Sequence, residues 1–242
     1  MSILDDLGKN LPIQGVYQDL AQPAVREAGE ALGNVAKVAR FALAPIDYLA
    51  SFQDRWQRYL KRLSEKVPEE RLVEPSPQVA GRVLDGLRYA DEDGVIAEMF
   101  LNLLARAMDK DRVSEAHPAF PLLISQLSPD EAMFLFQVKG PGVRRVEKYI
   151  DPHSLTYGYP RRSSVAYDFP LDVLSFPGNI EIYHNHLRTL NLIGEELVGE
   201  PDHSESERSG YTTTAVEENI EFTPFGRLFA RACIPDAVPP SK

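Results

Sequence analysis

SPQVAGRVLDGL (76–87) opens the stretch that decides the fold, and VIAEMFLNLLARAM (95–108), AHPAFPLLISQL (116–127) and SPDEAMFLF (128–136) complete it. Ser76 and Ser128 each precede a proline, so the serine can cap free helical amides where the proline lacks an N–H. Glu131, three residues after Ser128, completes a capping box. Apolar residues recur at helical spacing between these two starts. The stretch predicts a helical core that holds no catalytic constellation.

The composition predicts a soluble protein with a sizeable core. The chain has 242 residues, of which 43% are hydrophobic and 26% charged. A net charge of -10 disfavours non-specific contact with nucleic acid or anionic lipid. Cys233 is the single cysteine, which excludes an intrachain disulfide and fits a reducing compartment. Neither a secretory leader nor an apolar run of roughly 20 residues is present, so we expect a cytoplasmic protein, with attachment to a membrane surface as the alternative.

Two amphipathic helices are predicted within residues 23–66. The first, over 23–45, carries small apolar residues on one side and ends near Pro45. Such a helix either packs against another helix or lies on a membrane. Its polar face mixes acids with bases and is not Lys-rich, so we favour packing.

The second amphipathic helix, over 51–66, has an aromatic and aliphatic stripe beside a basic face. This pattern is typical of a lipid-surface or partner-binding helix, and also of a solvated face over a packed stripe. The candidate membrane or partner contacts are Phe52, Arg55, Trp56, Arg58, Tyr59, Lys61 and Arg62. A proline-rich connector (67–77) and core helices (78–127) complete a predicted helical domain over residues 1–127.

Beyond residue 128 the pattern changes. Residues 140–177, rich in Gly, Pro and Tyr, predict a loop-rich insert with at most one short strand. A helix follows from 178, with Ile182 expected to face inward, and then a polar hairpin over 197–222. Thr223-Pro224 starts the last helix, and 236–242 form a tail. This order resembles a winged helix-turn-helix over 128–235. The predicted fold is mainly α: an N-terminal helical bundle with a C-terminal winged-helix-like α+β module.

The charge of this module argues against simple DNA reading, because residues 191–222 carry nine acids against Arg208 alone. Basic side chains gather instead in the insert, and the expected recognition helix adds polar ones. The candidate nucleic-acid or partner contacts are Arg144, Arg145, Lys148, Arg161, Arg162, His184, Asn185 and Arg188. We favour a protein-interaction module and keep a DNA-binding regulator as the alternative.

No residue pattern predicts a reaction. His184 and His186 stand two apart, which places them on different sides of a helix, whereas metal pairs use spacings of three or four. Cys233 falls on the buried face of its helix, so it is not an activated nucleophile. Phosphate-binding glycine loops, serine elbows and paired-carboxylate motifs are not found. We therefore predict no catalytic residue, no metal, no cofactor and no enzymatic activity, with a toxin acting on nucleic acid as the weaker alternative.

The chain as a whole resembles the abortive-infection alpha family of bacterial phage-defence proteins. The resemblance rests on VYQDLAQPAVREAGEALGNV (16–35), VPEERLVEPSP (67–77), LNLLARAMD (101–109), AHPAFPLLISQLSPDEA (116–132) and TPFGRLFARAC (223–233). It implies a role in antiviral immunity, as sensor or effector, and carries over no active site. We expect assembly with a second defence-system protein, at a membrane surface or away from it. A phage component, membrane lipid, another copy of the chain and DNA are the alternative partners.

Overall fold

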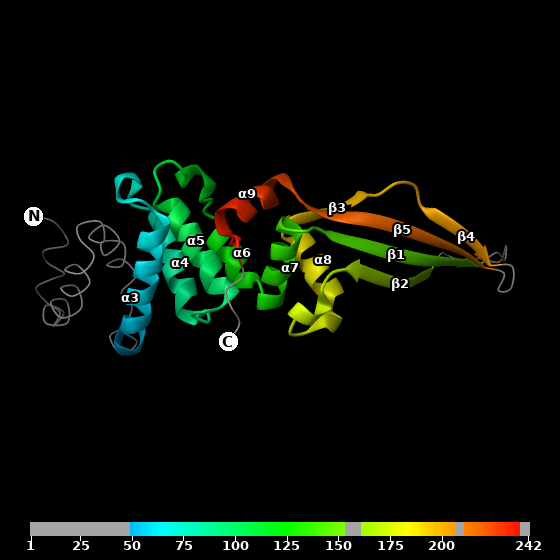
Figure 1. The fold of residues 1–242 in the computed structure, drawn as a ribbon, viewed down its shortest axis with the longest axis horizontal. Coiled ribbons are helices and arrows are strands. Elements are labelled where there is room, and N and C mark those ends of the chain that lie inside the picture. The colour runs from blue at the N-terminus through cyan, green and yellow to red at the C-terminus, as the bar shows by residue number, and fades with distance from the viewer. Residues whose placement is uncertain (1–48, 153–160, 207–210, 238–242) are drawn as a thin grey trace, which may run out of the picture. The chain divides into compact units, whose positions relative to one another are not determined.

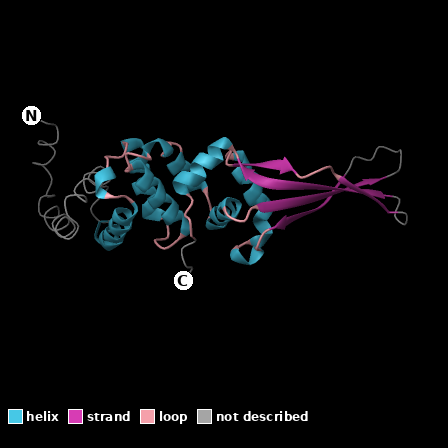
Figure 2. Cartoon of the chain, turned by 45° about the horizontal axis from the view of Figure 1, so that its top comes forward, coloured by secondary structure: helices cyan, strands magenta, loops and turns pink. Residues whose placement is uncertain are grey.

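The computed structural model describes residues 49–152, 161–206 and 211–237, and the chain divides into two compact units between Gln126 and Leu127. The described part is mixed α+β, with seven α-helices and one five-stranded antiparallel sheet (Figures 1 and 2). The sheet makes the fold less helical than the predicted mainly α class. The helix predicted at 23–45 and most of the predicted tail lie outside the described residues.

The N-terminal unit is helical and is centred on α5 (Val95–Ala107), which packs against three other helices, α3, α4 and α6. These are α3 (Leu49–Lys66), α4 (Pro77–Tyr89) and α6 (Phe120–Gln126). Two 3-10 turns, η2 (Glu69–Arg71) and η3 (Val113–Glu115), lie in the connections. Phe100, Leu103 and Met99 of α5 are fully buried, as the apolar spacing of this segment predicts.

The helix starts predicted from sequence are confirmed. The Ser76 hydroxyl accepts a hydrogen bond from the Val79 amide, and Thr223 accepts one from the Gly226 amide at 2.9 Å. At Ser128 both halves of the capping box are present, because Glu131 accepts in return from the Ser128 amide at 2.7 Å.

The C-terminal unit combines three helices with the sheet. The helices are α7 (Pro129–Lys139), α8 (Ile180–Thr189) and α9 (Pro224–Cys233). The strands are β1 (Val143–Pro152), β2 (Arg161–Asp168), β3 (Ile193–Leu197), β4 (Asp202–Ser206) and β5 (Tyr211–Phe222). Their order is β2-β1-β5-β3, and β4 also pairs with β5. The helices of this unit lie at one end of the sheet and β4 at the other (Figure 1).

The prediction of a loop-rich insert over residues 140–177 was wrong for the described part of this segment, residues 140–152 and 161–177. They supply β1 and β2, and β1 pairs with β2 on one side and with β5 on the other. Every second side chain at the start of β1 is buried, and these side chains are Val143, Arg145 and Glu147. Two of these three are charged, so the alternation of apolar and polar residues that marks a strand is hidden in the sequence.

The helix predicted from residue 178 is shorter than expected, and one side chain that was expected to be buried faces solvent. It ends at Thr189, and Asn191 adopts a left-handed conformation (φ 57°) before β3 begins at Ile193. Leu187 is buried, whereas Ile182, predicted to face inward, is 64% exposed.

Gly226 in α9 gives the first testable prediction. A Cβ atom at this position would lie 1.7 Å from the Leu192 carbonyl oxygen, so Gly226→Ala requires a backbone shift and is expected to cost more than about 2 kcal/mol. Gly81→Ala in α4 is the matched control, because a Cβ there meets no atom within 4 Å. That control is expected to stabilise the chain by about 0.5–1 kcal/mol, through helix propensity. Denaturant unfolding of both variants measures the difference, and equal stabilities would contradict the close packing of α9 on Leu192.

Candidate interaction surfaces

The basic face of α3 is neutralised within the N-terminal unit. Both carboxylate oxygens of Glu92 accept hydrogen bonds from the Arg58 guanidinium. Arg55 Nε lies 3.6 Å from Glu92 Oε2. Glu98 pairs with Arg62 and, at 2.5 Å, with Lys66. Hydrogen bonding by Arg58 lowers the pKa of Glu92. Burial alone would raise the pKa of Glu98, but the hydrogen bonds and charges of Lys66 and Arg62 together outweigh it and lower that pKa.

The opposite side of α3 is packed. Tyr59, Leu60 and Leu63 are buried, and the Trp56 ring meets the Tyr59 ring edge-on at 6.2 Å. Lys61 is exposed and has no ion pair among the described residues, while the Phe52 side chain lies outside them. Of the seven side chains predicted to contact a membrane or partner, three are therefore arginines tied to acids and one is the buried Tyr59.

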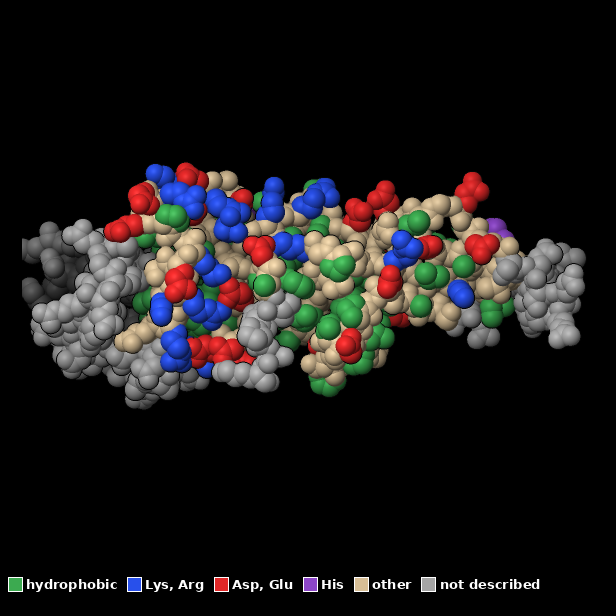
Figure 3. Space-filling view, in the orientation of Figure 1, with side chains coloured by type: hydrophobic (Ala, Val, Ile, Leu, Met, Phe, Trp, Pro, Cys, Tyr) green, Lys and Arg blue, Asp and Glu red, His purple; other side chains and the backbone are tan. Residues whose placement is uncertain are grey.

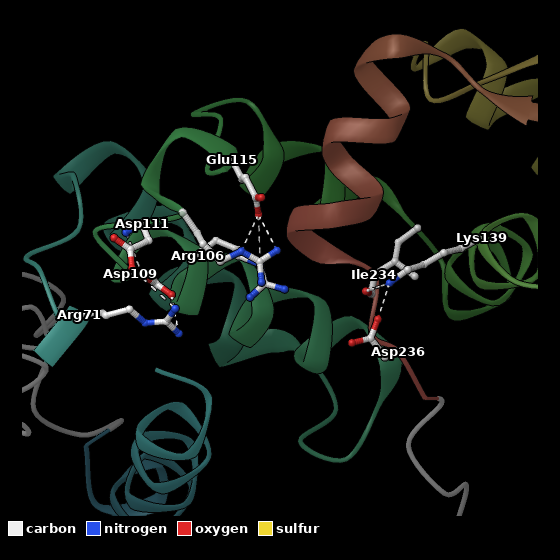
Figure 4. Close-up of polar contacts among 9 residues, drawn as sticks. Arg71, Arg106, Asp109, Asp111, Glu115, Lys139, Ile234 and Asp236 are labelled. Atoms are coloured by element: carbon white, nitrogen blue, oxygen red, sulfur yellow. Dashed lines mark hydrogen bonds and ion pairs between the residues drawn. The ribbon is translucent and has the colours of Figure 1, made fainter. Parts of the chain in front are cut away.

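The same internal pairing recurs elsewhere in each unit (Figure 4). In the N-terminal unit Arg71 reaches the buried Asp109 at 3.3 Å, and Glu115 binds Arg106 at 3.4 Å and Arg112 at 2.9 Å. In the C-terminal unit Lys139 donates to the Ile234 carbonyl at 2.8 Å and pairs with Asp236 at 2.9 Å.

Four of the arginines predicted to contact nucleic acid or a partner are also paired. Arg144 meets Glu217 at 2.7 Å, and Arg162 meets Glu181 at 2.5 Å. Arg188 lies 3.4 Å from Glu195. The fourth, Arg145, is 9% exposed and pairs with Glu147 at 2.8 Å and with Glu218.

The rest of this predicted set is divided between surface and core. Asn185 and Lys148 are exposed, and Lys148 has no ion pair in the described part of the chain. The Arg161 side chain lies outside the described residues. His184 is 2% exposed, with its ring beside Tyr167 and Phe134, so it belongs to the core of the unit.

Burial, followed by the charges of Arg145 and Arg188, lowers the pKa of His184 to about 4. Its Nε2 lies 3.2 Å from a Glu195 carboxylate oxygen but lacks hydrogen-bond geometry with it. The lowered pKa keeps the ring neutral at pH 7, so we treat this contact as a polar approach and not as an ion pair. His186 points to a different acid, with Nδ1 2.5 Å from Glu131.

Asp130 is a structural centre that sequence reasoning missed. It is 4% exposed and accepts hydrogen bonds from the Ser175 and Phe176 amides and the Tyr183 hydroxyl, each at 2.8 Å. Burial would raise its pKa, but the two backbone hydrogen bonds and that from Tyr183 outweigh it, so the pKa is lowered. The only sequence signal for it is its place in the SPDE motif (128–131), which indicates a helix start and not a buried carboxylate.

An open depression of about 400 Å³ lies at the helical end of the sheet, lined by the ends of β1, β2 and β5 and the start of α9. Its charged lining is Arg144, Asp168, Glu221 and Arg227. Both arginines are held by the protein itself, Arg144 by Glu217 and Arg227 by the Phe222 carbonyl at 2.8 Å. Arg227 keeps its charge, but Asp168 and Glu221 in the same lining balance the two arginines, so the depression has no net positive charge to attract a phosphate.

Within the described ranges, no three or more His, Cys, Asp or Glu side chains are grouped so as to hold a metal ion. In the same ranges no helix has both the length and the apolar content required to cross a bilayer.

Together the two units define a mixed α+β protein whose surface arginines are largely paired with its own acids. The family profile described as Abortive infection alpha matches residues 51–233, so the chain belongs to the abortive infection alpha family. This confirms the resemblance seen in the sequence, and membership implies a role in phage defence. No match was found among curated proteins or among solved structures.

The pKa of His184 predicts an acid-sensitive C-terminal unit. The unfolded chain takes up this proton near pH 6.5 and the folded chain near pH 4. The unfolded state therefore holds more protons between these values, and stability falls as the pH drops from 6.5 to 4. The expected loss at pH 5 is about 2 kcal/mol, before carboxylates titrate appreciably.

Denaturant unfolding at pH 7 and pH 5 measures this loss, and NMR follows protonation of the ring. His184→Gln is expected to remove most of the pH dependence, whereas His203→Gln, at an exposed position, keeps it. A ring that titrates near pH 6.5 in the folded protein would refute the predicted loss.

The carboxylate of Glu98 gives a prediction for the N-terminal unit. Glu98→Gln leaves Arg62 and Lys66 without their acid in a half-buried site, so a loss of about 1–3 kcal/mol is expected, smaller at high salt. Glu65→Gln, on the exposed side of α3, is the matched control and is expected to change stability by less than about 0.5 kcal/mol. Thermal and denaturant unfolding in low and high salt measure both, and equal effects would show that the pairing contributes nothing.

Proposed function

We propose that this chain is a non-enzymatic phage-defence protein that acts in the cytoplasm by assembling with a second protein, as sensor or effector. The observation that carries the proposal is the internal pairing of its cations. Glu92 and Glu98 hold the basic face of α3, and acids on β1, β3, β5 and α8 hold Arg144, Arg145, Arg162 and Arg188. Cations engaged in this way offer little attraction to phosphate, whether from nucleic acid or from lipid.

The charge of the C-terminal unit supports a protein partner. Residues 127–238 contain ten Lys and Arg against seventeen Asp and Glu. A net acidic surface repels nucleic acid and anionic lipid, and it steers association toward surfaces of opposite charge. Attachment to a membrane surface remains the alternative, with Lys61 and Trp56 on α3 as its contacts.

The proposed absence of a catalytic role is supported by the structural contacts of three buried ionisable groups. Asp130 binds two backbone amides, Glu131 completes a helix cap, and Arg145 joins two acids across the sheet. Each of these groups has a structural task that accounts for its burial.

A winged-helix-like module acting as a DNA-binding regulator is the second candidate. The order in which α8 is followed by β3 and by the β4–β5 hairpin, with β1 beside β5, favours it. A helix-turn-helix joins its two helices by a short turn, whereas β1 and β2 stand between α7 and α8. The likeness is thus confined to α8 and the strands that follow it, and His184 of the expected reading helix is buried.

Phage plating tests the defence role. Sensitive bacteria that express this chain with the neighbouring genes of its operon are expected to form at least about tenfold fewer plaques than cells with an empty vector. Cells that express the chain alone are expected to show little protection, because assembly requires the second protein. Equal plaque numbers in all three strains would contradict the defence role for the phages tested.

Two binding assays on the intact chain separate the alternatives. Mobility shift at low salt is expected to show no complex with duplex DNA, and a shift that weakens steeply with salt would establish the regulator instead. Co-sedimentation with phosphatidylglycerol vesicles is expected to leave the chain in the supernatant. Sedimentation that is lost in Lys61→Glu would establish the membrane alternative.

A further inference from the structure

The connection between β2 and α8 exposes a run of large apolar side chains, here named the apolar patch: Leu171 (44% exposed), Val173 (43%), Phe176 (67%) and Ile182 (64%). They lie within twelve residues that run through η4 (Leu171–Val173), η5 (Pro177–Asn179) and the start of α8. Figure 3 shows apolar side chains gathered over this segment, which Figure 1 draws in yellow. Gathered exposed apolar side chains of this kind mark interaction surfaces in soluble proteins.

The backbone that carries the patch is fixed to the core of its unit. Asp130 binds the Ser175 and Phe176 amides, and the Tyr183 hydroxyl bonds both Asp130 and the Phe176 carbonyl. Phe169 and Leu174, on either side of η4, are 7% exposed, and Phe169 stacks on Phe134 with 5.4 Å between ring centroids. The segment thus buries two apolar side chains and holds four others in solvent, so their exposure is built into the fold.

The charges around the patch indicate what it binds. Residues 168–182 carry three acids, Asp168, Asp172 and Glu181, and no Lys or Arg. Asp172 is exposed and has no ion pair among the described residues, whereas Glu181 is held by Arg162 and Asp168 stands opposite Arg144 in the β1–β2 register. A second copy in a two-fold dimer would bring like charges together, and an anionic membrane would meet the same repulsion. A cationic partner would be attracted instead.

We propose that the apolar patch is the docking surface for a cationic amphipathic segment of the partner protein. The inference rests on the proposed function and names its contact. Phe176 and Ile182 are the anchors, because they are the two most exposed side chains of the patch and a few residues carry most of the energy of an interface. Asp172, between Leu171 and Val173, binds Lys or Arg beside the apolar face of the incoming segment, most simply a helix whose apolar residues recur at spacings of three and four.

The test uses a synthetic helical peptide of Leu and Lys as the probe, with a Leu and Glu peptide of the same pattern as its control. Fluorescence anisotropy with the intact chain is expected to detect the Leu/Lys peptide and not the Leu/Glu peptide. Phe176→Ser combined with Ile182→Ser is expected to weaken binding by at least about tenfold. Asp172→Asn is expected to weaken it severalfold and to reduce its salt dependence.

Leu197→Ser is the matched control variant, because Leu197 is 63% exposed in the same unit but lies on β3, outside the patch. It is expected to bind the peptide as the unchanged protein does. All variants are expected to unfold at the same temperature within a few degrees, since the replaced side chains are largely in solvent. Equal binding by the patch variant and Leu197→Ser, or equal binding of the two peptides, would overturn the proposal.

Three further measurements fix the occupant and separate this inference from the proposed function. If sedimentation velocity shows a dimer that the patch variant abolishes, the occupant is a second copy and the proposed cationic segment is overturned. If the chain binds phosphatidylglycerol vesicles and the patch variant does not, the occupant is lipid and the proposal is likewise overturned. In the plaque assay with the intact operon, protection that is lost in the patch variant and kept in Leu197→Ser supports the docking surface. Protection kept in both overturns it while leaving the defence role intact, whereas no protection even from the unchanged protein counts against the defence role itself.

Discussion

The carboxylate of Asp130 is the interaction on which the C-terminal unit depends. It lies in the first turn of α7 and holds two amides of the β2–α8 connection and the Tyr183 hydroxyl of α8, so one buried charge joins three parts of the chain. Its neighbour Glu131 caps α7 and reaches His186 of α8. Burial would raise the pKa of Asp130, but hydrogen bonds from Ser175, Phe176 and Tyr183 outweigh it, so the pKa is lowered and the carboxylate stays ionised. The same contact fixes the backbone at Phe176, whose side chain is 67% exposed.

The second constraint is charge balance inside each unit. Glu92 and Glu98 hold four cations of α3, and the cross-strand partners of β1 hold Arg144 and Arg145. Single surface pairs contribute little, but shared acids such as Glu98, with 13% side-chain exposure, form networks that are less screened. Cations held in this way attract phosphate less than free ones would. Basic residues that dominate the sequence of α3 do not dominate its surface.

Features that depend on residues close together in sequence could be predicted, whereas features that depend on distant residues could not. Helix starts at Ser76, Ser128 and Thr223 depend on residues three apart and were predicted correctly. The strands of residues 140–177 were missed because β1 places Arg145 and Glu147 inward, where their partners come from β5 and from within β1 itself. Ile182 was expected to be buried because helical spacing shows which residues share a face of the helix, but not whether that face meets the core. The basic contact residues proposed from sequence were chosen without sight of their acids, which lie more than 30 residues away for Arg58 and Arg62.

The resemblance of whole sequence blocks indicated the family. By itself the sequence also determined the helices of residues 76–136, the caps that begin them and the acidic balance. These follow from local periodicity, from side-chain chemistry within one turn and from composition, none of which needs a partner distant in the chain. Only the tertiary structure decided which charges are available, where the sheet lies and which apolar side chains face solvent. Those properties depend on pairs far apart in sequence, such as Arg58 with Glu92 and Asp130 with Phe176. A paired charge and an available one look the same in the sequence, because the partner that distinguishes them is brought near only by folding.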